Sequence, residues 1–435
     1  MAKSDGQDKR GNKGDGCLTA LGRNKWRVFV DFGVNPITKK RERVTRVVNG
    51  TKAEARKVRD ELRKEHESGL RADADKMTFA ELSAIWNDAR TTSGTIASTT
   101  AYKDKYTLNT LLNYLGAINI KEITPAVVES LYSTIKCDKE KAGSSFGGTS
   151  MRHLHVMLKQ IMGKAVDYDL LLRNPCDRVK APKADEPDRK SLTVEEAARL
   201  LVCIDEAEAD AYANMEAKEA RQTARGNLFG REYLRGLNIV GNVLAVRIGL
   251  ATGMRRGEVF GLCWGSIDLE SRRLNVTQSL TSLGEVKPPK SKAGIRTVAI
   301  DATTCAHLRA WKQRQALELL KVGLKLGDST PVCCSEKGGF IDLHNFERWW
   351  RTFRNENGFM ELKFHELRHT QATQLLANGV DVKTVQTRLG HSNAALTLNW
   401  YAHAIPENDE KAADMLGNLF AGMPKETPII EVKTA

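Results

Sequence analysis

The C-terminal half of the chain carries side chains suited to holding a negatively charged oxygen. His365 and Arg368 are three residues apart in a helical pattern, so they share one face of a helix. Both can donate hydrogen bonds, and an arginine can grip an anionic oxygen with two parallel N–H groups. Arg255 lies much earlier, in a glycine turn that opens another predicted helix. Together these residue types favour binding of an anionic oxygen.

Two further residues, His391 and Tyr401, are candidates for the same site. His391 follows the glycine that ends a short predicted helix, and Tyr401 lies ten residues beyond it. A tyrosine attacks a phosphate only as it loses its proton, because its ordinary pKa is about 10. Taken alone, a tyrosine beside Trp400 is usually a packed aromatic, and a histidine at a helix start is usually a cap. The functional interpretation therefore rests on the order and spacing of the whole set.

Lysines are concentrated in the stretch 286–296, where the pattern predicts the tip of a β-hairpin. A lysine on such a tip can return a proton to a leaving oxygen. Lys290 and Lys292 both suit this role, and the sequence leaves the choice between them open. Glu258, three residues after Arg255, is expected to orient either that arginine or the base rather than to react. The alternative is an ordinary surface ion pair, which stabilises a protein little.

The elements that must position these residues are mostly helices. Apolar periodicity predicts helices at 237–250, 308–322, 343–355, 364–376 and 381–389, with two or three short strands between 272 and 300. The acidic and then Gly/Arg-rich stretch 205–231 is either a surface insertion or a long solvated helix. The sequence assigns no function to it.

Four motifs, in this order, resemble those of the tyrosine recombinase (phage integrase) family. They are Thr252-Gly253-Met254-Arg255-Arg256-Gly257-Glu258, the stretch from His365 to Arg368, Leu389-Gly390-His391, and Tyr401. The resemblance implies that Tyr401 is the nucleophile and that His365 is its base. It implies that Lys290, with Ser291 in place of the usual threonine, protonates the leaving oxygen. The residues that it assigns to phosphate binding are Arg255, Arg368 and His391.

The same resemblance implies a site-specific DNA recombinase that integrates and excises a mobile element through a 3′-phosphotyrosine. It implies no cofactor, and the sequence has no evident carboxylate cluster with metal-ligand spacing. The expected partners are double-stranded attachment-site DNA, further copies of the chain in a tetramer, and an excisionase or host DNA-bending protein. Two alternatives are a non-catalytic DNA-binding regulator built on a decayed recombinase and a type IB topoisomerase.

The whole chain is predicted to be multidomain and mainly helical. We expect a disordered basic arm at 1–16, an arm-site DNA-binding module of a three-stranded sheet plus a helix at 17–70, a helical core-binding (SAM-like) domain at 75–182, a mixed α+β catalytic domain at 190–404, and a tail with a subunit-docking helix at 405–435. The tail helix could instead pack on its own domain. The candidate DNA contacts are Arg23, Lys25, Arg27, Lys39, Lys40, Arg41, Arg43, Arg152 and Lys159.

The composition favours a polyanionic partner. Lys and Arg outnumber Asp and Glu by 67 to 54, which gives a net charge of +13. No apolar run reaches the length of a bilayer span, and the polar N-terminus lacks the apolar core of a signal peptide. The eight cysteines match neither a zinc-finger pattern nor a disulfide framework. We therefore expect a cytoplasmic, nucleoid-associated protein of a bacterial cell, with no membrane partner.

Overall fold

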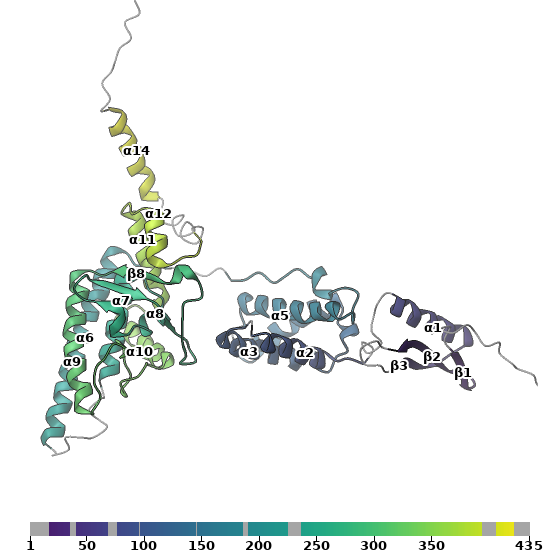
Figure 1. The fold of residues 1–435 in the computed structure, drawn as a ribbon. Coiled ribbons are helices and arrows are strands. Elements are labelled where there is room, and N and C mark those ends of the chain that lie inside the picture. The colour runs from purple at the N-terminus through teal and green to yellow at the C-terminus, as the bar shows by residue number, and fades with distance from the viewer. Residues whose placement is uncertain are drawn as a thin grey trace, which may run out of the picture. The chain divides into compact units, whose positions relative to one another are not determined.

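The computed structural model describes residues 17–34, 41–67, 76–94, 96–144, 146–185, 190–224, 236–393 and 406–421. The chain divides into two compact units, Met1–Pro187 and Asp188–Ala435, and each is described by itself (Figure 1). Some predicted features lie outside the described residues; these are the arm at 1–16, Lys39, Lys40 and Tyr401.

The first unit begins with a small antiparallel sheet and one helix. The strands β1 (Cys17–Gly22), β2 (Lys25–Val34) and β3 (Arg41–Asn49) pair in sequence order, and α1 (Lys52–Glu67) follows. Side chains alternate along β2, so Val28 and Val30 share one face and are buried in a cluster with Ala55 and Leu62 of α1. The opposite face of β2 carries its charged residues.

Four α-helices, with two short 3-10 turns, make up most of what the structure describes in the rest of this unit. They are α2 (Phe79–Thr92), α3 (Ser98–Leu115), α4 (Pro125–Lys141) and α5 (Gly148–Asp167). The predicted capping box of α2 is present: Thr78 accepts the N–H of Glu81, and the Glu81 carboxylate accepts the N–H of Thr78. The predicted cap of α4 is also present, since Thr124 accepts the N–H of Val127. The helices enclose their own apolar core.

The second unit combines helices with small antiparallel sheets. Its helices are α6 (Val194–Ala224), α7 (Leu237–Thr252), α8 (Arg256–Phe260), α9 (Ala302–Lys321), α10 (Leu343–Glu356), α11 (Phe364–Ala377), α12 (Val382–Leu389) and α14 (Pro406–Ala421). The strands β4 (Ile267–Asp268), β5 (Arg273–Val276) and β8 (Arg296–Ala299) form one antiparallel sheet, and β6 (Ser279–Leu280) pairs with β7 (Val286–Lys287). The predicted multidomain, mainly helical fold class is confirmed.

Helix α7 is the centre of the second unit (Figure 1). It is mostly apolar and mostly buried, with Asn242 and Arg247 among its buried polar residues, and it packs against α6, α9 and α11. Gly253 ends it in a left-handed conformation with φ 65°. Because of this turn, the chain enters α8 only a few residues later, with Arg255 at the junction.

The prediction of a lysine-rich hairpin tip at 286–296 is wrong. Strand β7 pairs back with β6, so the tip of that hairpin lies at 281–285. Strand β8 pairs instead with β5 of the other sheet. Lys290 and Lys292 therefore lie in the connection between the two sheets. Partner strands distant in sequence decided this pairing, and local alternation carries no information about them.

The stretch 205–231 was predicted to be either a surface insertion or a long solvated helix, and as far as residue 224 it is a helix that continues α6. Most of its side chains up to residue 217 are exposed, but Glu208, Ala211 and Met215 on one side are buried. One face of this helix therefore contributes to the core. Among the described residues, no helix is both long and apolar enough to cross a membrane.

Candidate active site

Arg368 is the most deeply buried of the predicted phosphate ligands. It lies in the second turn of α11 with 1% of its surface exposed, and its Nη1 donates to the carbonyl oxygen of Gly253 at 2.9 Å. Its Nη2 is buried and has no hydrogen-bond partner among the described residues. Burial, with the charges of Arg255 and Arg296, lowers the pKa of Arg368 to about 9. A buried guanidinium with an unused N–H is suited to an anion.

Arg255 lies at the start of α8, where its main chain and side chain are both held. Its backbone N–H donates to Glu258 Oε2 at 2.9 Å, and its Nη1 donates to Glu258 Oε1 at 2.7 Å. Its Nη2 donates to the carbonyl oxygen of Gly390 at 3.3 Å. The side chain remains 43% exposed, so a ligand can still reach the guanidinium.

Glu258 is the acidic centre of this arrangement. It is buried, and besides the two hydrogen bonds from Arg255 it accepts a third, from Arg296 Nη2 at 2.9 Å. Burial by itself raises the pKa of Glu258. The hydrogen bond and charge of Arg296, and then the hydrogen bond and charge of Arg255, outweigh burial and lower that pKa below its ordinary value. Glu258 therefore stays ionised and orients the two arginines, which agrees with the supporting role predicted for it.

His391 joins the arginines from the end of α12. Gly390 closes that helix with φ 67°, and the N–H of His391 donates to the carbonyl oxygen of Gln386 at 3.1 Å. Burial, and then the charges of Arg368 and Arg255, lower the pKa of His391 to about 4. Hydrogen bonds join the same three segments: Arg255 Nη2 binds the carbonyl oxygen of Gly390, next to His391, and Arg368 Nη1 binds that of Gly253, two residues before Arg255.

His365 and the lysines are the exposed members of the predicted set. His365 lies in the first turn of α11, and its ring meets that of His369 edge-on with centroids 5.0 Å apart. Lys290 and Lys292 are exposed, and their connection packs on the end of α12: a Cβ on Gly390 would lie 2.8 Å from the carbonyl oxygen of Ala293. Both lysines therefore belong to a segment that touches the His391 turn. Tyr401 lies outside the described residues.

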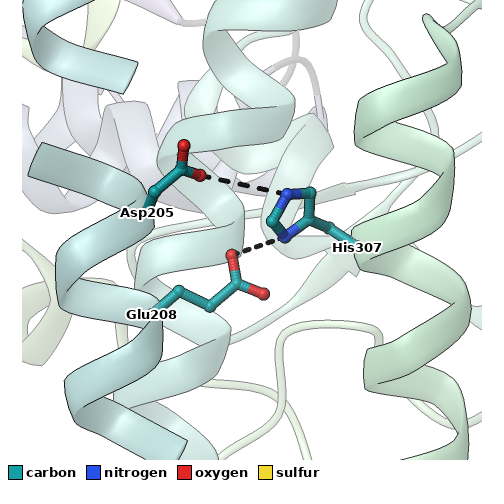
Figure 2. A group of neighbouring side chains, drawn as sticks. All are labelled: Asp205, Glu208 and His307. Atoms are coloured by element: carbon teal, nitrogen blue, oxygen red, sulfur yellow. Dashed lines mark ion pairs between the residues drawn. The ribbon is translucent and has the colours of Figure 1, made fainter. Parts of the chain in front are cut away.

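One group in the second unit has the side-chain types of a metal site. Asp205 and Glu208 of α6 face His307 of α9 (Figure 2), with 2.9 Å from Glu208 Oε2 to His307 Nδ1 and 3.9 Å from Asp205 Oδ1 to His307 Nε2. Arg247 of α7 pairs through Nη2 with the same two carboxylate oxygens. The guanidinium already neutralises the oxygens that a metal ion would need. We interpret this group as an ion-pair brace between three helices.

Two family models match the chain. The model described as "Phage integrase family" matches residues 237–408, and the model described as "Phage integrase, N-terminal SAM-like domain" matches residues 78–135. The first match spans every residue of the predicted catalytic set.

The chain belongs to the phage integrase family.

Curated relatives carry names that agree with this family. A "Tyrosine recombinase XerC-like" protein of Caldanaerobacter subterraneus is 28% identical over 85% of this chain and 90% of its own length. The "ICEBs1 integrase" of Bacillus subtilis is 26% identical over 92% of this chain and 98% of its own length.

A solved structure supports the same fold. The Tn1549 transposon integrase superposes with a TM-score of 0.57 at 20% identity, over 78% of this chain and all of that chain. At such identity, the likeness concerns the fold alone.

Three residues that hold this integrase site together were not identified from the sequence: Arg296, Gln371 and Arg388. Gln371 Nε2 donates to the carbonyl oxygen of Leu250 at 3.3 Å, and Arg388 Nη2 donates to that of Ala251 at 2.8 Å. Side chains of α11 and α12 therefore both bind main-chain carbonyl oxygens at the C-terminal end of α7. A signal for Gln371 was its position three residues after Arg368, which places it on the same helix face.

The predicted DNA contacts of this integrase lie on two surfaces. Lys25 and Arg27 are exposed on the face of β2 opposite Val28, and Arg23 is exposed in the preceding turn. Arg41 and Arg43 of β3 are 58% and 49% exposed, although both pair with Asp31, at 3.1 and 3.5 Å. In the helical part, Arg152 and Lys159 are exposed seven residues apart on α5, and Lys159 pairs with Asp177 at 2.8 Å. Lys39 and Lys40 lie outside the described residues.

Proposed function

We propose that this protein cleaves and rejoins duplex DNA through a 3′-phosphotyrosine at Tyr401, integrating and excising a mobile element. The observation that carries the proposal is the convergence of Arg255, Arg368 and His391. These residues come from the start of α8, from α11 and from the end of α12, yet Arg255 binds the carbonyl oxygen of Gly390, beside His391, and Arg368 binds that of Gly253, two residues before Arg255. Two guanidiniums and an imidazole in one cluster suit a single phosphate.

The phosphate-binding role follows from the charge that develops during attack. A nucleophile that approaches a phosphodiester adds negative charge to its non-bridging oxygens. Arg255 and Arg368 supply fixed positive charge there, and a neutral His391 can donate its ring N–H. Removing one such donor typically slows a reaction by about 100- to 1,000-fold. The buried, unused Nη2 of Arg368 is the N–H that we assign to this contact.

The proton transfers are assigned to the exposed residues. The phenol of Tyr401 loses its proton as it attacks, and we assign the base to His365 in the first turn of α11. The leaving 5′ oxygen regains a proton, and we assign the acid to Lys290, with Lys292 as its rival. One phosphate ester replaces another in this step, so religation needs no ATP. We propose no cofactor for the reaction.

We also propose that different parts of the chain bind and cleave the DNA. We assign arm-site DNA binding to 17–70, core-site binding to 75–182 and cleavage to 190–404. The exposed basic residues of β2, β3 and α5 support the first two assignments. The solved Tn1549 integrase is described in complex with transposon right end DNA, which agrees with a DNA substrate.

We propose a homotetramer on two synapsed DNA sites as the active assembly. A lambda integrase tetramer bound to a Holliday junction superposes with a TM-score of 0.50, at 16% identity over 88% of this chain and 94% of that chain. In the tail at 405–435, helix α14 exposes apolar side chains that suit docking on a neighbouring subunit. They are Met415, Leu416, Leu419 and Phe420. Packing on its own domain is the alternative.

The biological setting is inferred from the relatives' names. Curated relatives include the transposase of Tn916 and the ICEBs1 integrase, so we propose action on a mobile element in a bacterial cell. Its place would be the cytoplasm, at the nucleoid, since its substrate is DNA. An excisionase or a host DNA-bending protein is the partner expected to set direction.

A nicked suicide substrate tests the function. The substrate carries the attachment site, sought in the DNA that flanks the gene, with a nick next to the cleavage point that releases a short strand after attack. The wild-type protein should form a covalent DNA adduct that Tyr401→Phe does not form. No adduct with any site would favour the decayed-regulator alternative. Strand exchange between two sites separates a recombinase from a topoisomerase, which relaxes DNA without exchange.

A further inference from the structure

Arg296 is a buried arginine that the proposed chemistry does not use. It begins β8, where alternation with Val298 turns it toward the interior, and its side chain is only 4% exposed. All three of its donor groups are bound. Nε donates to the carbonyl oxygen of Arg388 at 2.6 Å, Nη1 to that of Gly294 at 3.0 Å, and Nη2 to Glu258 Oε2 at 2.9 Å.

Each of these partners belongs to a different segment of the proposed site. Glu258 holds the backbone and side chain of Arg255. Arg388 lies in the last turn of α12, which leads to His391. Gly294 ends the short turn that begins at Lys292. One guanidinium therefore joins the first arginine motif, the histidine turn and the lysine connection.

The end of α12 receives two guanidiniums. Arg296 binds the carbonyl oxygen of Arg388, and Arg255 binds that of Gly390. Carbonyl oxygens at a helix C-terminus carry partial negative charge and lack partners within the helix. The two arginines are also linked to each other through Glu258. Arg255, Glu258, Arg296 and the α12 turn thus form a closed ring of hydrogen bonds.

We propose that Arg296 is a positioning residue for strand cleavage, which holds Arg255 and the His391 turn in register around the scissile phosphate. The proposal rests on the function proposed above. Arg296 does not contact the phosphate; it acts through Glu258 and through the carbonyl oxygen of Arg388. A misplacement of about 1 Å in a catalytic group can slow a reaction about 100-fold, so the loss of this ring should slow cleavage.

The test compares two substrates for Arg296→Lys in the full chain. Lysine keeps the positive charge but cannot form the three directed hydrogen bonds of a guanidinium. One suicide substrate carries the ordinary scissile phosphate, and the other carries a methylphosphonate, which has no negative charge for Arg255 to neutralise. Arg296→Lys should cleave the phosphodiester about 100-fold more slowly than wild type. On the methylphosphonate, its deficit should shrink to less than about 10-fold, as it should for Arg255→Lys.

A merely structural role predicts another result. A general loss of folded protein lowers cleavage of both substrates by the same factor, and that outcome would overturn the proposal, as would wild-type rates on both. Arg309→Lys is the matched control, because Arg309 also binds a main-chain carbonyl, that of Leu269, and an acid, Glu270. It should cleave as wild type does.

Further results distinguish a failure of the positioning role from a failure of the proposed function. If Arg296→Lys does not fold, Glu258→Gln with Arg296→Gln removes both buried charges, keeps polar side chains, and should show the same substrate dependence. If the wild-type protein forms no adduct through Tyr401, the proposed function fails, whatever the variants do. If wild type cleaves and Arg296→Lys matches Arg309→Lys, only the positioning role fails.

Discussion

Arg368 Nη1 donates a hydrogen bond to the carbonyl oxygen of Gly253, which lies 115 residues earlier, at 2.9 Å. Gly253 begins the turn that leads to Arg255, so this contact fixes one predicted phosphate ligand to the backbone that carries another. A Cβ on Gly253 would lie 2.5 Å from Leu389 Cδ2, so the turn has little space in which to shift. The spacing of the two arginines is therefore set by the main chain.

We expect Arg368→Lys to slow adduct formation by about 100- to 1,000-fold, because a single ammonium cannot both bind Gly253 and present a second N–H to the phosphate. The measurement is single-turnover cleavage of the suicide substrate, with duplex affinity determined in parallel. Affinity should change only a few-fold, since most DNA contacts are expected elsewhere. A loss of rate below 10-fold would contradict the assigned role.

Gly390→Ala should destabilise the second unit and slow cleavage. Gly390 has φ 67°, and an added Cβ would lie 2.8 Å from the carbonyl oxygen of Ala293 and 3.0 Å from the Arg296 side chain. We expect a loss of about 1–3 kcal/mol from backbone strain, with the steric contact added to it. The matched control is Gly379→Ala, which has φ 80° but nothing within 4 Å of the added Cβ. Thermal unfolding of both variants should show the larger loss for Gly390→Ala, and equal losses would contradict the close packing.

Stability should depend on pH through His391. Its pKa is about 4 in the folded protein, against an ordinary value of about 6.5 in an unfolded chain. As the pH falls from about 6.5 to 4, the unfolded chain takes up a proton at this residue before the folded protein does. The free energy of unfolding therefore falls over that range. Thermal midpoints at several pH values should fall less steeply for His391→Asn than for wild type.

The control for this pH dependence is His344→Asn, which alters an exposed histidine of α10. It should keep the wild-type slope. Identical slopes for wild type and His391→Asn would show that burial beside the arginines does not disfavour the protonated imidazole.

Arg247→Met should strongly destabilise the second unit, because it leaves the buried carboxylate of Glu208 without its guanidinium. Breaking a buried ion pair typically costs about 3–5 kcal/mol. The double variant Glu208→Gln with Arg247→Met removes both charges and should recover part of this loss. Thermal unfolding measures both effects. A rise in the wild-type midpoint on addition of Zn²⁺ or Mn²⁺ would favour a metal site over the ion-pair brace.

The sequence predicted what local patterns encode. The capping box of Thr78 and Glu81, the Thr124 cap and the left-handed glycine after α12 each depend on residues within one turn, and all three are present. The motif arginines and His391 were found because their spacing resembles a family pattern. The structure adds that they cluster, which local periodicity does not determine.

The errors concern contacts between distant segments. Arg296 binds Glu258 across 38 residues and Arg388 across 92 residues, so no window of sequence contains these pairs. The pairing of β8 with β5 depended likewise on the whole sheet, and the hairpin prediction at 286–296 failed for that reason. From sequence alone, Glu208 of α6 is expected to be a surface acid, because nothing local indicates its ion pair with Arg247 of α7.

The ring of hydrogen bonds around the proposed site constrains which of its positions can change during evolution. The acceptors at Gly253, Arg388 and Gly390 are main-chain oxygens, which every amino acid possesses. Mutation at position 388 can therefore change the side chain without abolishing the acceptor that Arg296 uses. The donors Arg255, Arg296 and Arg368 cannot be replaced in the same way, because only a guanidinium offers several directed N–H groups. Substitution should therefore be purged most strongly at the donors Arg255, Arg296 and Arg368. Gly253 and Gly390 are constrained for a different reason, because their left-handed turns leave no space for a Cβ.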